Sequence, residues 1–414
     1  MRISIERRSQ AFWLICIFLL TGCPSKPSPT PVQPAERPLL ERLSPAQLPD
    51  FQDDEPADSL RSAIKKSLSW YAGIPGDRQV CLGRLRVPAE VIRESLNHFS
   101  SLVGSGCISA DRLSQDFDVF RVIPPDNSGR IIVTGYYEPV LEGSLKPGVE
   151  FCRPIYPVPS DLLVIELDRF DGNKFHGERL VGRLEKNSVV PYYSRSEIDG
   201  EKALEKHGVQ PTMPLVWLRD PVDCFFLHIQ GSAVIRINPD GTQMRVGYAG
   251  ANGRPYHSIG KDLIDSGAVS PEQMSMQAIG EYLRSHPDSQ NAIMWKNESY
   301  VFFKWVSQGP LGSLDVVLTA GRSIATDHRF HPSGALAFLV SEKPVYDSSG
   351  KIQRWERFGR WVLNQDSGGA IKGPGRIDLF CGTGEAAERI AGPMKQRGEL
   401  YYFIKKGLIC QEPQ

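Results

Sequence analysis

The sequence predicts a mainly β protein with a few helices, and three observations carry this prediction. The 414 residues include 38 Gly and 32 Pro, more than an average chain, so many turns are expected. Between about residues 130 and 260, and again in the C-terminal third, apolar residues occur in short runs typical of strands. Asn238-Pro239-Asp240-Gly241 separates two such runs, Ala233–Ile237 and Thr242–Tyr248, as a hairpin turn does.

The composition excludes several classes of protein. The 48 Lys+Arg equal the 48 Asp+Glu, so the chain has no excess of basic residues that would favour binding to nucleic acid. Nucleic acid is therefore not expected as a partner. Hydrophobic residues at 41% and charged residues at 23% are the balance of an ordinary globular protein. The length allows two or three domains, each with its own core.

The N-terminus has the pattern of an export signal. Three arginines lie within the first eight residues, and the apolar run Ala11–Leu20 follows them. A run of this length is too short for a membrane-spanning helix, which needs about 20 residues. Residues 1–22 are therefore predicted to be a signal peptide.

The signal ends in Leu20-Thr21-Gly22-Cys23, which resembles a bacterial lipobox. The resemblance implies that Cys23 is acylated and anchors the chain in lipid, whereas an ordinary signal peptide or an uncleaved anchor are the alternatives. Pro24 in place of Asp implies, by resemblance to lipoprotein sorting, the outer membrane with the protein facing the periplasm. Residues 23–59 hold nine prolines and no strong hydrophobic period, so they are predicted to be a Pro-rich tether.

Cysteine usage leaves the disulfides open. An exported chain enters an oxidising compartment, where six remaining cysteines allow 15 pairings. The sequence contains no CxxC pair, so a structural zinc site is not expected. No cofactor is expected either. These cysteines are Cys81, Cys107, Cys152, Cys224, Cys381 and Cys410.

The first half of the folded part combines helices and strands. Helical spacing occurs in Leu60–Tyr71 and Val87–Leu102, and Arg130–Val140 is typical of a strand. Asp223–Ile237 is predicted to be a strand interrupted at Gly231-Ser232.

The second half begins with one well-marked helix. Ser270 can cap it, Pro271 suits its first turn, and Pro287 marks its end. A short helix at about 384–395 lies between the last two of five predicted strands, which are Asp315–Thr319, Leu336–Ser341, Arg360–Asn364, Arg376–Phe380 and Glu399–Lys405. Both ends of the chain are expected to form one β-rich body (60–140 and 258–414), with a second β domain (141–257) between.

The stretch from Gln365 to Asp378 is the strongest candidate for chemistry. Asp366 and Asp378 lie twelve residues apart around four glycines and Lys372, and Asp378 has apolar neighbours on both sides. Burial of a carboxyl group raises its pKa and suits it to general acid catalysis, although a surface Asp at a strand end would give the same pattern. The stretch contains neither a phosphate-binding loop nor a dinucleotide fingerprint.

From about Val133 to Lys405 the chain resembles the membrane-bound lytic murein transglycosylase A family. The motifs that carry the resemblance are Thr134–Pro139, Leu227–Ser232, Gly247–Tyr256, Asn297–Phe303, Gly309–Gly312, Thr319–Asp327 and the stretch Asp366–Asp378. The resemblance implies a double-psi β-barrel made from the N- and C-terminal parts, with a smaller β domain inserted and a substrate groove where the two meet.

The resemblance also implies roles for particular residues. Asp378 matches the catalytic acid of the three-aspartate region, and Asp327 and Asp366 match its structural supports. Cys381 departs from the aromatic residue expected there, which puts stacking in the groove in doubt. The residues expected to contact substrate are Thr134, Gly135, Tyr136, Glu138, Gln230 and Lys372.

The implied reaction cleaves the β-1,4 bond between N-acetylmuramic acid and N-acetylglucosamine without water, leaving a 1,6-anhydro end. The partners implied are peptidoglycan glycan strands, outer-membrane lipid through acylated Cys23, and other cell-wall enzymes. The resemblance implies an exolytic enzyme, whereas the residues themselves leave chain-end and internal cleavage open. Two alternatives remain: a lysozyme-type hydrolase, which needs Glu138 or Asp366 as a second carboxylate, and a non-catalytic glycan-binding lipoprotein.

Overall fold

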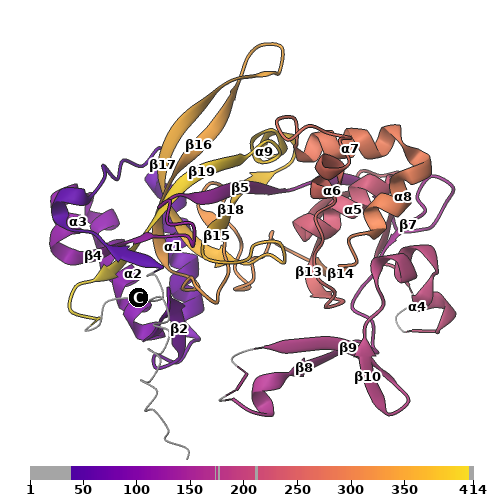
Figure 1. Ribbon diagram of the computed structural model, residues 1–414, viewed down its shortest axis with the longest axis horizontal. Coiled ribbons are helices and arrows are strands. Elements are labelled where there is room, and N and C mark those ends of the chain that lie inside the picture. The colour runs from indigo at the N-terminus through magenta and orange to yellow at the C-terminus, as the bar shows by residue number, and fades with distance from the viewer. Residues whose placement is uncertain (1–38, 173, 176–177, 210–212, 410–414) are drawn as a thin grey trace, which may run out of the picture. The chain divides into compact units, whose positions relative to one another are not determined.

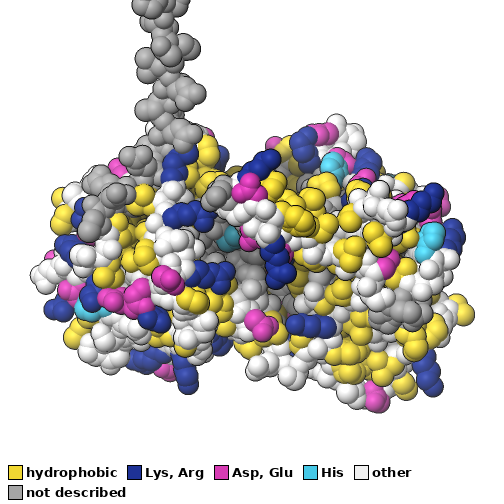
Figure 2. All heavy atoms as spheres, turned by 90° about the horizontal axis from the view of Figure 1, so that it is seen from below, with side chains coloured by type: hydrophobic (Ala, Val, Ile, Leu, Met, Phe, Trp, Pro, Cys, Tyr) yellow, Lys and Arg dark blue, Asp and Glu magenta, His cyan; other side chains and the backbone are white. Residues whose placement is uncertain are grey.

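The computed structural model describes residues 39–409 except 173, 176–177 and 210–212 (Figure 1). The predicted signal peptide, the lipidation of Cys23 and the sixth cysteine, Cys410, lie outside these residues. Within the described part, no helix combines the length and the apolar character needed to cross a bilayer. On the face seen in Figure 2, basic and acidic side chains are interspersed among hydrophobic ones, as the zero net charge suggests.

Six strands close into a barrel. Their order is β19-β16-β17-β15-β18-β5, and β5 pairs back with β19. Strand β18 is parallel to β5, and β15 is parallel to β17, so the ring mixes both kinds of pairing. The strands are β5 (Ile131–Glu138), β15 (Ser323–Ala325), β16 (Leu336–Tyr346), β17 (Ile352–Asp366), β18 (Arg376–Thr383) and β19 (Lys395–Lys405).

The barrel therefore combines distant parts of the chain, as predicted for a body built from both ends. Strand β5 precedes the inserted part and lies between two C-terminal strands, β18 and β19. Apolar residues at alternate positions, such as Ile131 and Val133 with no exposed surface, form the barrel interior. Around the barrel lie β4 (Phe117–Val122), the hairpin of β2 (Gln79–Leu82) and β3 (Leu85–Pro88), and helices α1 (Ala57–Ala72), α2 (Ala89–Ser105) and α3 (Ala110–Asp116).

Residues 39–56, assigned by the sequence to the tether, are packed on the barrel instead. Strand β1 (Leu40–Arg42) pairs with β4, and the Phe51 ring lies 5.1 Å from the Phe338 ring. Arg322, which has no exposed surface, donates hydrogen bonds of 2.9 Å to the Asp53 carboxylate. The high proline content predicted a free tether, but a few apolar and acidic residues of this segment have partners far away in the sequence that hold it on the barrel.

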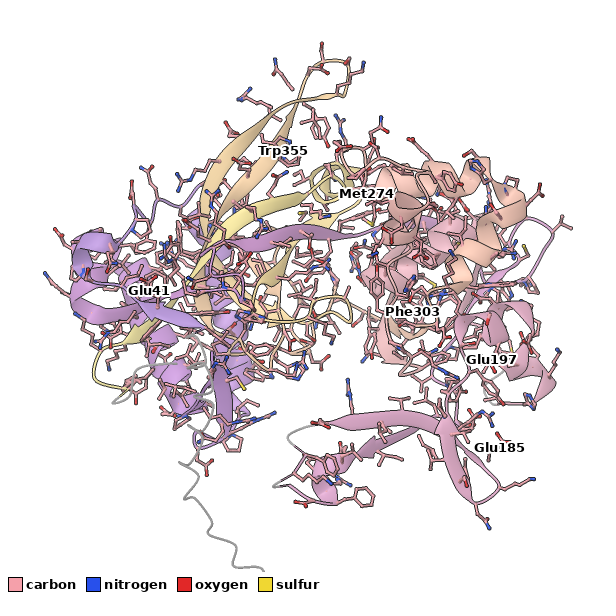
Figure 3. The ribbon with its side chains drawn as sticks, viewed as in Figure 1. Glu41, Glu185, Glu197, Met274, Phe303 and Trp355 are labelled. Carbon is pink, nitrogen blue, oxygen red and sulfur yellow. The ribbon has the colours of Figure 1, made fainter. Side chains whose placement is uncertain are left out.

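The inserted part is built on a six-stranded sheet of order β14-β13-β12-β6-β11-β7. The predicted hairpin at 238–241 is confirmed, since β12 pairs with β13 across it. Phe303 of β14 is fully buried in the core of this sheet (Figure 3). The strands are β6 (Val140–Ser144), β7 (Arg153–Ile155), β11 (Val216–Leu218), β12 (Ser232–Ile237), β13 (Gln243–Ala251) and β14 (Val301–Val306). A separate three-stranded sheet comprises β8 (Leu163–Glu166), β9 (Arg179–Glu185) and β10 (Ser188–Pro191).

The predicted strand Asp223–Ile237 is wrong in its first half. Residues Pro221–Gln230 form helix α5, and only Ser232–Ile237 is a strand. The Asp220 side chain accepts from the Val222 N–H, Pro221 occupies the first turn, and Gly231 ends the helix at φ 80°. These are the usual signals of a capped helix. The prediction nevertheless favoured a strand, because the segment is a nearly continuous apolar run without helical periodicity.

Two other predictions need correction. Helix α7 (Met276–Ser285) is capped by Ser275 rather than Ser270, and Pro287 begins the next helix, α8 (Pro287–Trp295). Residues 315–319 are not a strand, because only an isolated bridge joins Leu311 to Val317. The remaining α-helices of the described residues are α4 (Ala203–Lys206), α6 (Ile259–Asp265) and α9 (Glu385–Ala391).

Candidate active site

Four neighbouring barrel strands bring two of the three aspartates together. Asp378 on β18 pairs with Ala325 on β15 and with Thr134 on β5. Ala325 in turn pairs with Asp366 at the end of β17. Paired residues on adjacent strands project to the same side of a sheet, so Thr134, Asp378 and Ala325 form one row. The register shifts at Ala325, and the hydrogen bond that Asp366 accepts from Tyr136 of β5 places Asp366 beside this row. These four residues are called the aspartate row below.

Asp378 is held in an environment that disfavours its charge. Burial raises the pKa of its carboxyl from 3.8 to about 7, and the negative charge of Asp366 adds to this rise. Hydrogen bonding to Thr134 and the positive charge of Arg376 oppose it. The Oδ1 atom is buried and has no hydrogen-bond partner in the part of the chain that the structure describes. A carboxyl group with a pKa near 7 can both donate and accept a proton at neutral pH.

Asp366 is fully engaged in hydrogen bonds. Its Oδ2 accepts from the Tyr136 hydroxyl at 2.7 Å, and its Oδ1 accepts from the backbone N–H groups of Ser313 and Ser367, both at 2.8 Å. Burial raises the pKa of Asp366, and these bonds oppose the rise. The Tyr136 ring, whose centroid lies 5.3 Å from that of Phe380, is thereby fixed between Asp366 and Phe380. Asp366 therefore holds the Tyr136 side chain and the loop that contains Ser313 in place.

Asp327, the third aspartate, lies outside this row. Its carboxylate accepts from the Arg329 side chain at 2.9 and 2.6 Å and from the Gly373 N–H at 2.8 Å. These hydrogen bonds hold the pKa of Asp327 well below its usual range, in spite of burial. Asp327 therefore fixes the loop that contains Lys372, whose own side chain is exposed.

Glu138, predicted to contact substrate, has no exposed surface. It accepts from Arg245 at 2.7 and 3.3 Å and from the Thr383 hydroxyl at 2.8 Å. Arg245 belongs to β13, so this ion pair joins the six-stranded sheet to the barrel. The structure therefore places Glu138 in a structural contact and not on an accessible surface.

Gln230 and Gly135 also hold β5 in place. The Gln230 Oε1 accepts from the Tyr137 N–H at 3.1 Å. A Cβ atom at Gly135 would lie 2.8 Å from the Ala391 Cα of helix α9, so only glycine allows this close approach. Cys381 packs in the same region, against the small apolar cluster that includes Ala391, instead of taking part in ring stacking.

Two residues near Asp378 were missed by the sequence analysis. One is Tyr256, whose pKa is raised mainly by burial. The positive charge of Arg376 lowers this pKa, and the negative charge of Asp378 raises it further. The Arg376 Nε is buried and receives no hydrogen-bond partner from residues 39–409 as described. Arg376 precedes Asp378 by two positions on one strand, a spacing that places both side chains on one face and could have revealed it. For Tyr256, only its place in the Gly247–Tyr256 motif gave a signal.

The five cysteines in the described part of the chain are free thiols. Cys224 is buried, and Cys107 and Cys152 are exposed. Burial raises the pKa of the Cys381 thiol to about 12, so it is not a reactive nucleophile.

Comparisons with known proteins agree on one family. Residues 132–304 match the MltA specific insert domain, and residues 322–404 match the 3D domain. Membrane-bound lytic murein transglycosylase A of Escherichia coli K12 is 32% identical over 287 residues, covering 69% of this chain and 68% of that protein. The protein of the same name from Vibrio cholerae is 29% identical over 290 residues, covering 70% and 69%.

Solved structures show the same architecture. A membrane-bound lytic murein transglycosylase from Agrobacterium tumefaciens is 29% identical with a TM-score of 0.72, covering 89% of this chain and 98% of that chain. Escherichia coli MltA with bound chitohexaose is 25% identical with a TM-score of 0.63, covering 92% and 99%. The predicted fold class, a double-psi β-barrel with an inserted β domain and few helices, is confirmed. The chain belongs to the membrane-bound lytic murein transglycosylase A family.

Proposed function

We propose that this protein is a lytic transglycosylase that cleaves the β-1,4 bond between N-acetylmuramic acid and N-acetylglucosamine in peptidoglycan. Asp378 is its single acid and base. The observation that carries the proposal is one carboxyl group with a pKa of about 7 and an unpaired Oδ1, set in a row of otherwise engaged side chains. The relatives are named for activity on murein, and one was solved with a chitin oligosaccharide bound.

The reaction needs two proton transfers through the same carboxyl group. Protonated Asp378 gives its proton to the glycosidic O4 as the C1–O4 bond breaks. The resulting carboxylate then takes the proton of the muramic C6 hydroxyl, and O6 bonds to C1 to close the 1,6-anhydro ring. Because the attacking hydroxyl belongs to the same sugar, its effective concentration is high and no water needs activation.

The surroundings favour this reaction over hydrolysis. A glycoside hydrolase requires a second carboxylate that serves a water or attacks C1. Glu138 is fully buried in its ion pair with Arg245, and both oxygens of Asp366 accept hydrogen bonds. Neither of the two candidates is therefore free for that role.

The remaining site residues divide into two groups. Thr134 and Tyr136, beside Asp378 on the partly exposed face, are proposed to contact the sugar, together with Lys372 from the loop that Asp327 fixes. Gly135, Glu138 and Gln230 are proposed to shape the site from beneath, by holding β5 against α9, β13 and α5 respectively.

The membrane location is part of the same proposal. Relatives in this family are named membrane-bound. Acylated Cys23 would anchor the chain in the outer membrane, facing the periplasm, where glycan strands and other cell-wall enzymes are its partners. The predicted division into a barrel (60–140 with 258–414) and an insert (141–257) enters this proposal in revised form: β14 (Val301–Val306) pairs with β13, so the insert extends to about residue 306.

The decisive test is a digest of purified peptidoglycan by the full chain in detergent, with the products weighed by mass spectrometry. Fragments one water lighter than reducing-end fragments are expected, and Asp378→Asn should release none. Reducing-end fragments would instead identify a hydrolase. Absence of products together with glycan binding that survives Asp378→Asn would identify a binding lipoprotein.

A further inference from the structure

A pocket of about 50 Å³ lies in the inserted part, among residues that do not belong to the aspartate row. Strand β7, helices α5 and α8, and the segment before α4 form its walls. That segment includes Glu197, which is labelled in Figure 3. The proposed reaction uses none of the residues that line this pocket.

Positive charge dominates the pocket. Arg153, Arg195 and Lys202 line it, with Asp199 as the single carboxylate. Arg195 is 2% exposed, and its NH1 lies 3.8 Å from the Asp199 carboxylate, too far for a hydrogen bond. The positive charges of all three cations act on Asp199, so one carboxylate serves three cations.

Arg153 has an unused hydrogen-bond donor here. Its Nε is buried, and none of the described residues hydrogen-bonds to it. The Nε and NH2 groups of Arg195, in contrast, donate to the backbone carbonyls of Asn297 at 3.0 Å and Ser299 at 2.6 Å. Arg153 itself is half-buried, but a buried N–H without a partner is costly unless an acceptor completes it. The pocket is therefore short of one acceptor.

The backbone beside the pocket is irregular. Ser196–Gly200 forms a π-helical turn, and Lys202 has a φ of 59°, a conformation that a side chain with a Cβ disfavours. Such features persist where the surroundings enforce them, often at binding sites. Here they hold Asp199 and Lys202 at the pocket wall.

The other walls are mostly apolar, which restricts the kind of anion. They consist of Pro154, Pro221, Cys224, Phe225, Met294 and Trp295, together with the polar side chain of Asn291. One water molecule needs about 10–15 Å³ of such free volume, so the pocket has room for a small group of several heavy atoms. We propose that this pocket binds a carboxylate with a short aliphatic substituent, through the Arg153 Nε and Lys202. Two sources share this chemistry: the C-terminal carboxylate of a D-alanyl peptide and a free short-chain acid.

The test measures binding directly, so it succeeds or fails independently of the proposed catalysis. The full chain in detergent is titrated by calorimetry with N-acetyl-D-alanyl-D-alanine, its C-terminal amide, acetate and inorganic phosphate. Binding of the dipeptide and of acetate is expected, without binding of the amide. If the dipeptide binds more tightly than acetate, the natural ligand is a peptide C-terminus. If the dipeptide and acetate bind with equal affinity, the natural ligand is a free short-chain acid. Binding of the amide as tight as that of the acid, or binding of phosphate alone, would overturn the proposal.

Variants locate the site. Arg153→Gln and Lys202→Gln should each weaken dipeptide binding about tenfold or more, since each removes a charge-assisted bond. Arg219→Gln is the matched control, because Arg219 is exposed, pairs with Glu150 and does not line the pocket. Lys202 is exposed, so its variant remains informative even if Arg153→Gln does not fold. Equal effects of all three substitutions, or no effect of either pocket variant, would refute the site.

Tryptophan fluorescence gives a second readout of position. Trp295 lines the pocket, so the dipeptide should change the emission of the parent chain but not that of Trp295→Phe, whose affinity for the dipeptide is measured separately by calorimetry. A fluorescence change that persists in Trp295→Phe would place the ligand elsewhere.

Discussion

Replacing Asp378 with Asn should abolish turnover and, at neutral pH, stabilise the fold. The two effects have one cause, because the same burial that raises the pKa to about 7 makes the ionised carboxylate unfavourable in the folded state. Loss of general acid catalysis alone predicts a rate reduction of roughly 10²–10⁴-fold. A purely structural Asp would show the opposite effect on stability.

The size of the stability gain follows from the same shift. A rise in pKa from 3.8 to about 7 corresponds to a cost of at most about 4 kcal/mol for the ionised folded form. Solvent still reaches part of the side chain, so we expect a measured gain of about 2 kcal/mol for Asp378→Asn. The folded state binds more protons than the unfolded state between pH 3.8 and 7. The gain should therefore be absent below about pH 4, increase as the pH rises, and be complete above about pH 7.

The assay is urea unfolding of parent and variant, followed by circular dichroism at pH 4 and pH 8. Asp327→Asn provides the control of opposite sign, because its hydrogen bonds lower the pKa of Asp327. Its ionised form contributes stability above the unfolded pKa, and this is lost as the pH falls through the folded pKa. Asp327→Asn should therefore lose about 1–3 kcal/mol at pH 8. If Asp378→Asn is less stable than the parent at pH 8, the carboxylate is a structural acceptor and our account of its pKa is wrong.

Three further predictions test the site and its supports. The rate of anhydro-product formation should fall as the pH rises above about 7, because the first step needs protonated Asp378; a rate that stays level to pH 9 would contradict this assignment. Glu138→Gln should cost about 3 kcal/mol in urea unfolding, since it leaves Arg245 without its buried carboxylate, and a cost below about 1 kcal/mol would show that the ion pair is not structural. Gly135→Ala should cost about 1–3 kcal/mol, because the new methyl group meets the Ala391 Cα at 2.8 Å, whereas Ala at exposed Gly369, where a Cβ meets open space, should be neutral.

Local patterns in the sequence determined much of this protein. The Asn238–Gly241 turn between two apolar runs predicted the β12–β13 hairpin, because turn and strand preferences act over a few residues. Apolar neighbours on both sides of Asp378 predicted a buried acid, and its pKa of about 7 agrees with this. The failure at Asp223–Gln230 was also local, since a short apolar run does not distinguish a helix from a strand.

The tertiary structure alone decided which polar groups pair with one another. Glu138 was expected to face substrate, yet Arg245, 107 residues away, holds it in the interior. The Tyr136 hydroxyl reaches Asp366 over a separation of 230 residues, and Arg322 meets Asp53 over 269. The sequence shows which residues can carry charge or donate a hydrogen bond. Burial and pairing, which set the free energy of that charge, depend on neighbours that only the closed barrel brings together.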